Sequence, residues 1–137
     1  MGSRAFLAAL TPIARTAFGA PEGELKVFPF RVGRESRQGE APPSGAVREM
    51  RNPNNKPNND LYLVEARELM NVSREHFQIV RDGEGYALED RGSTLGTLVE
   101  GQKVGGDNRG GRVGLGDGDV IIVGSSHSPY VFKFRLR

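Results

Sequence analysis

Short runs of alternating apolar and polar residues, separated by glycine-rich turns, dominate this chain. Alternation with a period of two places every second side chain on the same face, which is typical of β-strands with one buried face. The runs that predict strands are 24–27, 28–32, 77–81, 86–89, 97–99 and 131–136. Two further runs are continuously apolar: 61–64 predicts a return to ordered structure, and 120–124 predicts a buried strand. The strands are short, regularly spaced and not interrupted by any long helical pattern. The sequence therefore predicts an all-β sandwich.

The pattern is less regular at three places. Residues 5–18 are apolar and contain Pro12, and their local pattern does not distinguish a strand from a helix. The apolar phase slips by one residue between Val27 and Phe28, which predicts a bulge or a corner, and a proline at position 29 favours an edge strand. Residues 105–118 are rich in glycine and polar side chains, so we expect turns there.

Residues 36–59 differ in composition from the rest of the chain, because they contain four of the eight prolines and five asparagines. Such a segment has too little apolar surface to order itself, and we expect one long mobile loop. This segment begins next to Arg34, so it starts beside whatever Arg34 binds. A tolerated surface insertion is nevertheless the simpler interpretation of its length. With residues 1–4 as a flexible N-terminus, we expect a single domain over residues 1–137.

The composition excludes several classes of protein. The chain has no cysteine, which excludes disulfide frameworks, thiol catalysis and cysteine-based zinc sites. Its 19 basic and 17 acidic side chains are mixed in sign, unlike the single-sign surface of a nucleic-acid binder. No apolar run approaches the length of about 20 residues that crosses a bilayer. We therefore expect a cytoplasmic protein with no nucleic-acid partner and no membrane partner.

Polar side chains gather at the ends of three strand-like runs. These clusters are Gly33-Arg34, Ser73-Arg74-Glu75-His76 and Gly92-Ser93-Thr94-Leu95-Gly96-Thr97. Loops at the ends of strands in a rigid scaffold often converge on one ligand. A guanidinium matches phosphate oxygens two at a time, and hydroxyl groups add further donors. Arg34, Ser73, Arg74 and Thr94 together predict a site for a phosphate carried by another protein.

Other chemistries are less well supported by these residues. Ser73 and His76 suggest a hydrolase, but they lie three residues apart, without a Gly-x-Ser-x-Gly motif or an evident third member. A structural histidine that holds Ser73 in place is the better interpretation. The glycine- and aspartate-containing segment 114–119 lacks the spacing of a phosphate-binding loop or of a calcium loop. We expect no catalytic residues, no metal and no cofactor.

Four segments give the chain a resemblance to the forkhead-associated (FHA) domain family. They are Gly33-Arg34, Ser73-Arg74-Glu75-His76, the run from Gly92 to Gly101, and the run from Leu115 to Gly124 with its final Phe132-x-Phe134 strand. The resemblance implies an FHA-like β-sandwich of about eleven strands, of Greek-key type, whose loops bind phosphothreonine peptides.

The family pattern also implies a role for each matching residue. The residues that the pattern assigns to phosphopeptide binding are Arg34, Ser73, Arg74, Thr94 and Leu95. Those that it assigns to structural support of the site are Gly33, His76 and Gly96. Within the first group, Arg34 pairs with the phosphate and Ser73 donates its hydroxyl to it. Arg74 adds charge to the same pocket.

Leu95 departs from the family pattern, in which an asparagine commonly bonds the backbone of the bound peptide. Leucine cannot make that bond, and an unmet buried partner costs about 1–3 kcal/mol, or roughly tenfold in affinity. The sequence therefore predicts a phosphothreonine-binding interaction module in Ser/Thr kinase signalling, without catalysis. The alternative is a phosphate-independent interaction scaffold on the same fold, and a small Ser/His hydrolase is a remote third.

Overall fold

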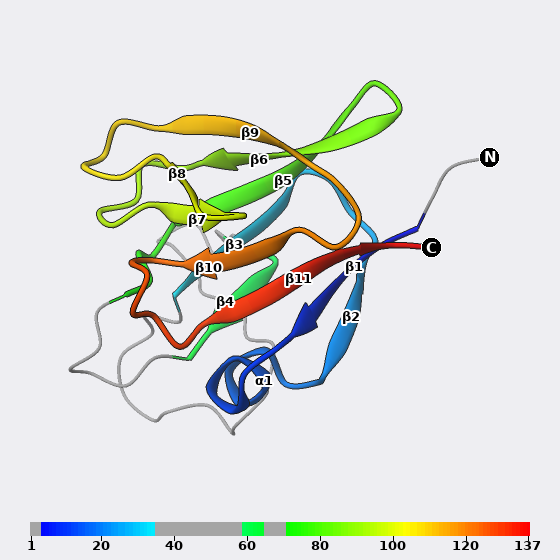
Figure 1. The fold of residues 1–137 in the computed structure, drawn as a ribbon, viewed down its shortest axis with the longest axis horizontal. Helices are drawn as coiled ribbons and strands as arrows, with labels where there is room; N and C mark the ends of the chain where they lie inside the picture. The colour runs from blue at the N-terminus through cyan, green and yellow to red at the C-terminus, as the bar shows by residue number, and fades with distance from the viewer. Residues whose placement is uncertain (1–3, 35–58, 65–70) are drawn as a thin grey trace, which may run out of the picture.

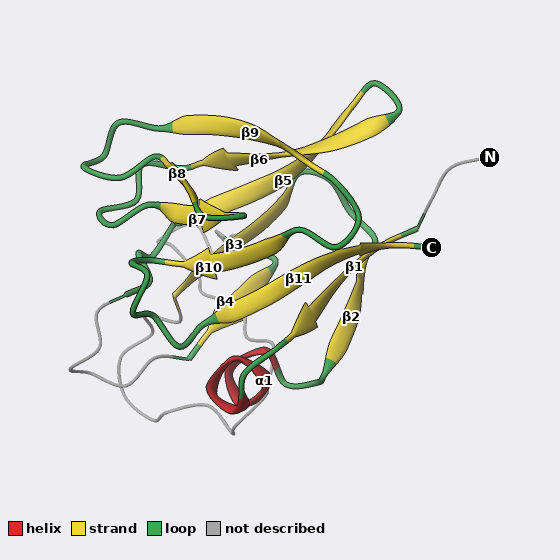
Figure 2. Cartoon of the chain, in the orientation of Figure 1, coloured by secondary structure: helices red, strands yellow, loops and turns green. Residues whose placement is uncertain are grey.

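The computed structural model describes residues 4–34, 59–64 and 71–137, which form a sandwich of two β-sheets with one short helix (Figures 1 and 2). The first sheet has the order β2 (Glu22–Leu25), β1 (Ala5–Ala9), β11 (Val131–Leu136), β10 (Val120–Val123), β7 (Thr97–Val99) and β8 (Gln102–Val104). The second has the order β4 (Leu61–Leu63), β3 (Phe30–Arg34), β5 (Phe77–Asp82), β6 (Gly85–Asp90) and β9 (Gly111–Leu115). The predicted all-β sandwich of about eleven strands is confirmed for the described residues.

One hydrophobic core lies between the two sheets. On β11, Phe132 and Phe134 are buried and alternate with half-buried neighbours, which is the period that the sequence shows. Phe134 meets Tyr86 of the opposite sheet edge-on, with ring centroids 5.5 Å apart. In the second sheet, Ile79 of β5 pairs with Leu88 of β6, and both are fully buried. Full burial of such side chains contributes about 1.5–3 kcal/mol each, so the core fixes the positions of both sheets.

The ambiguous N-terminal segment is a strand followed by a helix, α1 (Pro12–Phe18). Thr11 has an extended backbone, and its side chain accepts a hydrogen bond from the Ala14 amide at 3.0 Å, so it is the N-cap. Proline at the first helical position fits because its missing N–H has no helical partner there. Gly19 ends the helix in the left-handed conformation, with φ of 98°.

The phase slip near Phe28 is a corner at which the chain changes sheets. β2 belongs to the six-stranded sheet, whereas β3 belongs to the five-stranded one. The expectation of an edge strand beside Pro29 is wrong, because β3 lies between β4 and β5. Pro29 precedes β3, so its missing N–H does not interrupt the ladder.

The prediction of turns throughout residues 105–118 is wrong, because this segment contains the strand β9. β9 pairs antiparallel with β6, from Asp90 opposite Gly111 to Tyr86 opposite Leu115. Leu115 is buried and Val113 packs against the core. One of the glycines that suggested turns marks a close backbone approach, because a Cβ at Gly111 would lie 2.7 Å from the Gly105 amide nitrogen.

Strand direction brings three loops to one end of the sandwich (Figure 1). β3 runs antiparallel to β5, with Val32 opposite Phe77, so the end of β3 lies beside the start of β5. β6 is antiparallel to β5 in turn, with Asp90 opposite Phe77, so the loop after β6 begins at the same end.

No helix in the described ranges is long and apolar enough to span a membrane.

The N-cap of α1 also joins the helix to the strand layer, because the Thr11 hydroxyl donates to the Pro129 carbonyl. We expect Thr11→Ala to lower the free energy of unfolding by about 1–2 kcal/mol, since it removes both bonds. Urea denaturation measures the change. Thr16→Ala is the matched control: Thr16 is exposed within the same helix, and alanine favours helix there. Equal losses in the two variants contradict the capping role.

Candidate functional site

One pocket of about 620 Å³ lies at the end of the sandwich where the three loops meet. Its lining comprises Arg34, Val72, Ser73, Arg74, Glu75, Arg91, Gly92, Thr94 and Leu95. The structure therefore brings together all five side chains that the sequence nominates for binding. They come from the end of β3, the segment before β5 and the loop between β6 and β7.

Arg34 ends β3 and is tied to the segment that precedes β5. Its backbone amide donates to the Ser73 carbonyl at 2.9 Å, and its Nη1 donates to the Val72 carbonyl at 3.2 Å. These two bonds hold the half-buried guanidinium against the pocket wall. A guanidinium has five N–H donors in a fixed fork, so a group anchored in this way presents donors in a defined direction.

Gly33 allows two backbone segments to approach closely under the pocket. A Cβ atom at this position would lie 1.9 Å from the Arg74 carbonyl oxygen and 2.6 Å from Asn59 Nδ2. Both distances are far shorter than van der Waals contact, so no side chain fits. Glycine at this position therefore permits the close approach of the two segments.

His76 joins two of the three loops from inside the protein. Its side chain is fully buried, with Nδ1 accepting a hydrogen bond from the Ser73 amide at 2.9 Å. Nε2 therefore carries the proton and donates to the Gly96 carbonyl at 2.7 Å. Burial lowers the pKa of His76 below its ordinary value of 6.5, although the Gly96 carbonyl and the Asp90 charge oppose that shift. The imidazole is neutral at pH 7.

Ser73 and Thr94 connect the same two loops at the surface. The Thr94 amide donates to Ser73 Oγ at 3.0 Å, so the serine hydroxyl has a fixed position beside Thr94 and keeps its own O–H donor. The two ring nitrogens of His76 bond backbone groups, and neither bonds the Ser73 hydroxyl. The histidine is therefore not placed as a general base for this serine.

A turn fixed by Asp90 carries Thr94 and Leu95. The Asp90 carboxylate accepts hydrogen bonds from the Gly92 amide at 2.7 Å, from the Ser93 amide at 3.0 Å and from the Ser93 hydroxyl. Ser93 is fully buried, and its Oγ accepts from the Gly96 amide at 3.0 Å. The side chains of Thr94 and Leu95 are exposed between these anchored positions.

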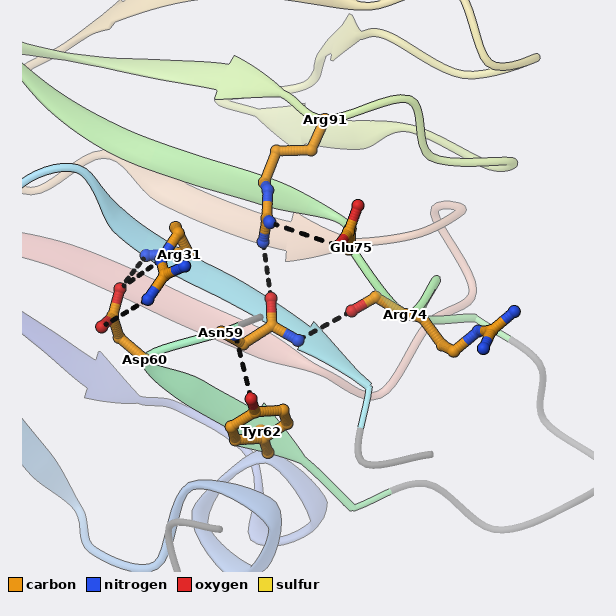
Figure 3. A network of polar contacts seen from close by, with 7 residues as sticks. All are labelled: Arg31, Asn59, Asp60, Tyr62, Arg74, Glu75 and Arg91. Carbon is orange, nitrogen blue, oxygen red and sulfur yellow. Dashed lines mark hydrogen bonds and ion pairs between the residues drawn. The ribbon is translucent and has the colours of Figure 1, made fainter. Parts of the chain in front are cut away.

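Asn59 supports the pocket from below, and sequence reasoning missed it (Figure 3). It is 2% exposed, although the composition of residues 36–59 assigns it to a mobile loop. Residues 35–58 lie outside the described residues, so only this last position of the predicted loop is compared with the structure. Its backbone amide donates to the Tyr62 hydroxyl at 3.0 Å, and its side-chain Nδ2 donates to the Arg74 carbonyl at 2.8 Å. Its local sequence gives no signal for this role, because it ends a polar segment that is rich in asparagine.

Arg91 is a third guanidinium of the pocket that the sequence analysis did not nominate. Its Nη1 donates to Asn59 Oδ1 at 2.5 Å, and its Nη2 lies 3.8 Å from the Glu75 carboxylate. Burial lowers its pKa, and Glu75 opposes that shift, but an arginine stays charged near neutral pH. Figure 3 shows the Arg91 guanidinium directed toward Asn59 and the Arg74 guanidinium directed away from both.

The chemistry of the lining suits an oxyanion. It contains three guanidinium groups and one carboxylate, so its net charge is positive, with hydroxyl donors from Ser73 and Thr94 beside them. Within the described ranges, no three carboxylate or imidazole side chains are grouped to hold a metal ion. The Arg34 guanidinium and the Ser73 hydroxyl are anchored by bonds to backbone groups, so these two donors are positioned before any ligand arrives.

Comparisons with known proteins agree with this architecture. A family model described as the FHA domain matches residues 30–124. No curated protein matches the chain. Among solved structures, Mycobacterium tuberculosis EmbR in complex with a low-affinity phosphopeptide is 22% identical with a TM-score of 0.60. The alignment covers 97% of this chain but 24% of EmbR, so the chain spans about a quarter of that protein.

Two further structures align over nearly their whole length. The kinase-interacting FHA domain of the kinase-associated protein phosphatase KAPP from Arabidopsis is 21% identical, with a TM-score of 0.60 over 99% of this chain and 96% of that one. A structure from an analysis of phosphothreonine-dependent FHA domain interactions is 20% identical, with a TM-score of 0.58 over 98% and 97%. At these identities the likeness shows a shared fold.

The lowered pKa of His76 makes stability depend on pH. In the unfolded chain the imidazole takes up a proton near pH 6.5, whereas in the folded protein it does so at a lower pH. We expect the free energy of unfolding to fall by up to about 1 kcal/mol from pH 7.0 to 5.5, above the range in which carboxylates titrate. Urea denaturation at both values measures the difference. His127→Gln, which replaces the other histidine, should keep this fall, and His76→Gln should lose it. A fall that is unchanged in His76→Gln contradicts the assignment.

The close approach at Gly33 predicts a large effect of one methyl group. We expect Gly33→Ala to lose about 2–4 kcal/mol of folding free energy, because the backbone of Arg74 and the side chain of Asn59 must both move. Gly114→Ala is the control, since a Cβ there meets nothing within 4 Å in the edge strand β9. Thermal unfolding compares the two variants. Similar melting temperatures for both show that the space at Gly33 is not limiting.

Proposed function

The chain belongs to the FHA domain family, and we propose that it is a protein-interaction module that binds phosphothreonine peptides in the pocket between β3, β5 and the β6–β7 loop. The observation that carries the proposal is the convergence of Arg34, Ser73, Arg74 and Thr94 on that one pocket. These residues lie far apart in the sequence, and the pairing of β3, β5 and β6 brings them together.

The proposed ligand matches the pocket in charge and in hydrogen bonding. A phosphorylated threonine carries about −1.5 to −2 charges at pH 7 and three acceptor oxygens. In the proposed complex, Arg34 pairs with two of these oxygens and Ser73 donates its hydroxyl to the third. Arg74 adds positive charge at the rim. The bonds of Arg34 to the Val72 and Ser73 carbonyls hold it in place without ligand, which lowers the entropy that binding costs.

Two of the similar structures support the same class of ligand. EmbR was solved with a phosphopeptide, and another neighbour comes from work on phosphothreonine-dependent FHA interactions. By this proposal the partner is a protein that a Ser/Thr kinase has phosphorylated, and the module acts in signalling within the cytoplasm. EmbR is about four times as long as this chain, so its remaining activities are not part of the proposal.

The geometry of Ser73 and His76 favours binding over catalysis. A serine nucleophile needs a base that accepts its proton, and the base here is engaged by the Ser73 amide and the Gly96 carbonyl. The imidazole is also fully buried, away from any ligand in the pocket. We propose that both residues fix the loops and that the module performs no reaction of its own.

A phosphate-independent scaffold is the second candidate, and Leu95 is the observation that favours it. This leucine is 38% exposed on the pocket wall, at the position where the family commonly has an asparagine that bonds the peptide backbone. Without that bond, affinity for any phosphopeptide is lower by roughly tenfold. A larger share of the binding energy then comes from contacts that do not involve phosphate.

Binding to a degenerate phosphothreonine peptide library, compared with the unphosphorylated library, tests the proposal. We expect retention of the phosphorylated peptides alone. For a retained peptide, Arg34→Ala should raise Kd by roughly ten- to a hundredfold, because it removes charge-assisted hydrogen bonds that contribute about 1.5–3 kcal/mol. Isothermal titration calorimetry measures Kd.

Arg4→Ala is the matched control for lost charge. Arg4 lies immediately before β1, pairs with Glu24 of β2 and is absent from the pocket lining. Its loss should therefore leave Kd within about twofold. If both libraries bind equally and Arg34→Ala has no effect, phosphate recognition is wrong and the phosphate-independent scaffold takes its place.

A further inference from the structure

Leu95 is a large apolar side chain on the wall of a pocket whose other side chains are mainly charged or polar. It is one of four exposed large hydrophobic residues in the part of the chain that the structure describes. The other three are Leu10, Ile13 and Val27, and none of them lines the pocket. Isolated exposed leucines are common on protein surfaces, so what distinguishes this one is its place next to Thr94 in the chain, in the lining of the pocket that also holds the guanidinium groups.

The backbone on both sides of Leu95 is fixed by hydrogen bonds. On one side, Thr94 donates its amide to Ser73 Oγ at 3.0 Å and accepts from the Asp107 amide at 2.8 Å. On the other side, the Gly96 carbonyl accepts from the Gly124 amide at 3.0 Å and from buried His76. The backbone that carries the leucine is therefore fixed, and a ligand that covers the side chain orders little backbone in doing so.

The pocket has more room than a phosphate group needs. Its volume of about 620 Å³ lies within the range of about 300–1,000 Å³ that is typical of sites for whole small ligands. The donors of Arg34 and Ser73 mark one part of this space for the anion. Leu95 borders the same space, so the phosphate donors and an exposed apolar side chain share one pocket.

From this arrangement we propose that Leu95 determines specificity, by selecting phosphothreonine peptides that carry a large aliphatic or aromatic side chain next to the phosphothreonine. The inference rests on the proposed function and names the class of partner for that site. An apolar side chain gains free energy when it and Leu95 leave water together. A serine or aspartate at the same position loses water without gaining a hydrogen-bond partner from the leucine, so it is disfavoured.

Paired phosphothreonine peptides test this specificity. The probes are a phosphopeptide selected from the degenerate library and versions of it with leucine, alanine, serine or aspartate at each flanking position in turn. At one position we expect leucine to bind about five- to tenfold more tightly than serine. In Leu95→Ala and in Leu95→Asn this ratio should fall close to one, while the ratio of phosphorylated to unphosphorylated binding remains large.

Leu10→Ala is the matched control, because Leu10 is 43% exposed and lies outside the pocket lining. It should keep the preference for leucine over serine. Circular dichroism of each variant shows that the fold is retained, and Leu95→Asn keeps a side chain of similar length.

The results separate the inference from the function on which it depends. A preference for apolar neighbours that Leu95→Ala abolishes and Leu10→Ala keeps supports the inference. Phosphate-dependent binding without such a preference, or with a preference that Leu95→Ala leaves unchanged, overturns the inference and leaves the proposed function in place. Equal binding of phosphorylated and unphosphorylated peptides overturns the proposed function, and the inference with it.

Discussion

The hydrogen bonds of the buried His76 imidazole hold the candidate site together. One nitrogen accepts from the Ser73 amide and the other donates to the Gly96 carbonyl, so a single side chain spans the segment before β5 and the loop after β6. The bond from the Thr94 amide to Ser73 Oγ closes the same connection at the surface. A buried polar group that is satisfied at both ends rigidifies its surroundings, whereas one that loses a partner is costly. These bonds fix the spacing of Ser73 and Thr94, so that spacing is a property of the fold.

Strand pairing explains why this histidine has two loops to join. β5 is the central strand of its sheet, and antiparallel neighbours on both sides place the end of β3 and the end of β6 next to its first residue. Arg34 reaches the pocket from one neighbour and Thr94 from the loop that follows the other. The positive charge of the site also results from strand pairing, because Arg34, Arg74 and Arg91 come from three separate segments and line one pocket. The hydrophobic core supplies the rigidity, and the strand ends supply the donors.

Local sequence patterns predicted much of this fold, and the exceptions have physical reasons. Period-two alternation marks β5 and β11 because each has one buried face, whereas β9 was missed because its glycines resemble turns and its stability comes from pairing with β6. Arg34 and Ser73 were identified because their chemistry and order match a known pattern. Asn59 and Arg91 were not, because nothing local shows that the Asn59 amide is buried between the Arg74 carbonyl and the Arg91 guanidinium. That role depends on the absence of a side chain at Gly33, a long-range contact that one-dimensional reasoning does not reveal.

By our proposal, Leu95 decides how a pocket of this kind can discriminate among ligands. Phosphate recognition by anchored guanidinium and hydroxyl groups is strong but generic, because every phosphothreonine offers the same oxygens. Backbone hydrogen bonds are equally generic, because every peptide has the same backbone. A leucine at this position cannot make a hydrogen bond to the peptide backbone, so it loses affinity that all phosphopeptides would share. Any contact that it makes instead depends on the peptide side chain next to the phosphothreonine. Specificity is a difference between affinities. Replacing a contact that all phosphopeptides share by one that only some can make therefore lowers the affinity for most ligands more than for the matching ones, and this is how weaker overall binding becomes more selective.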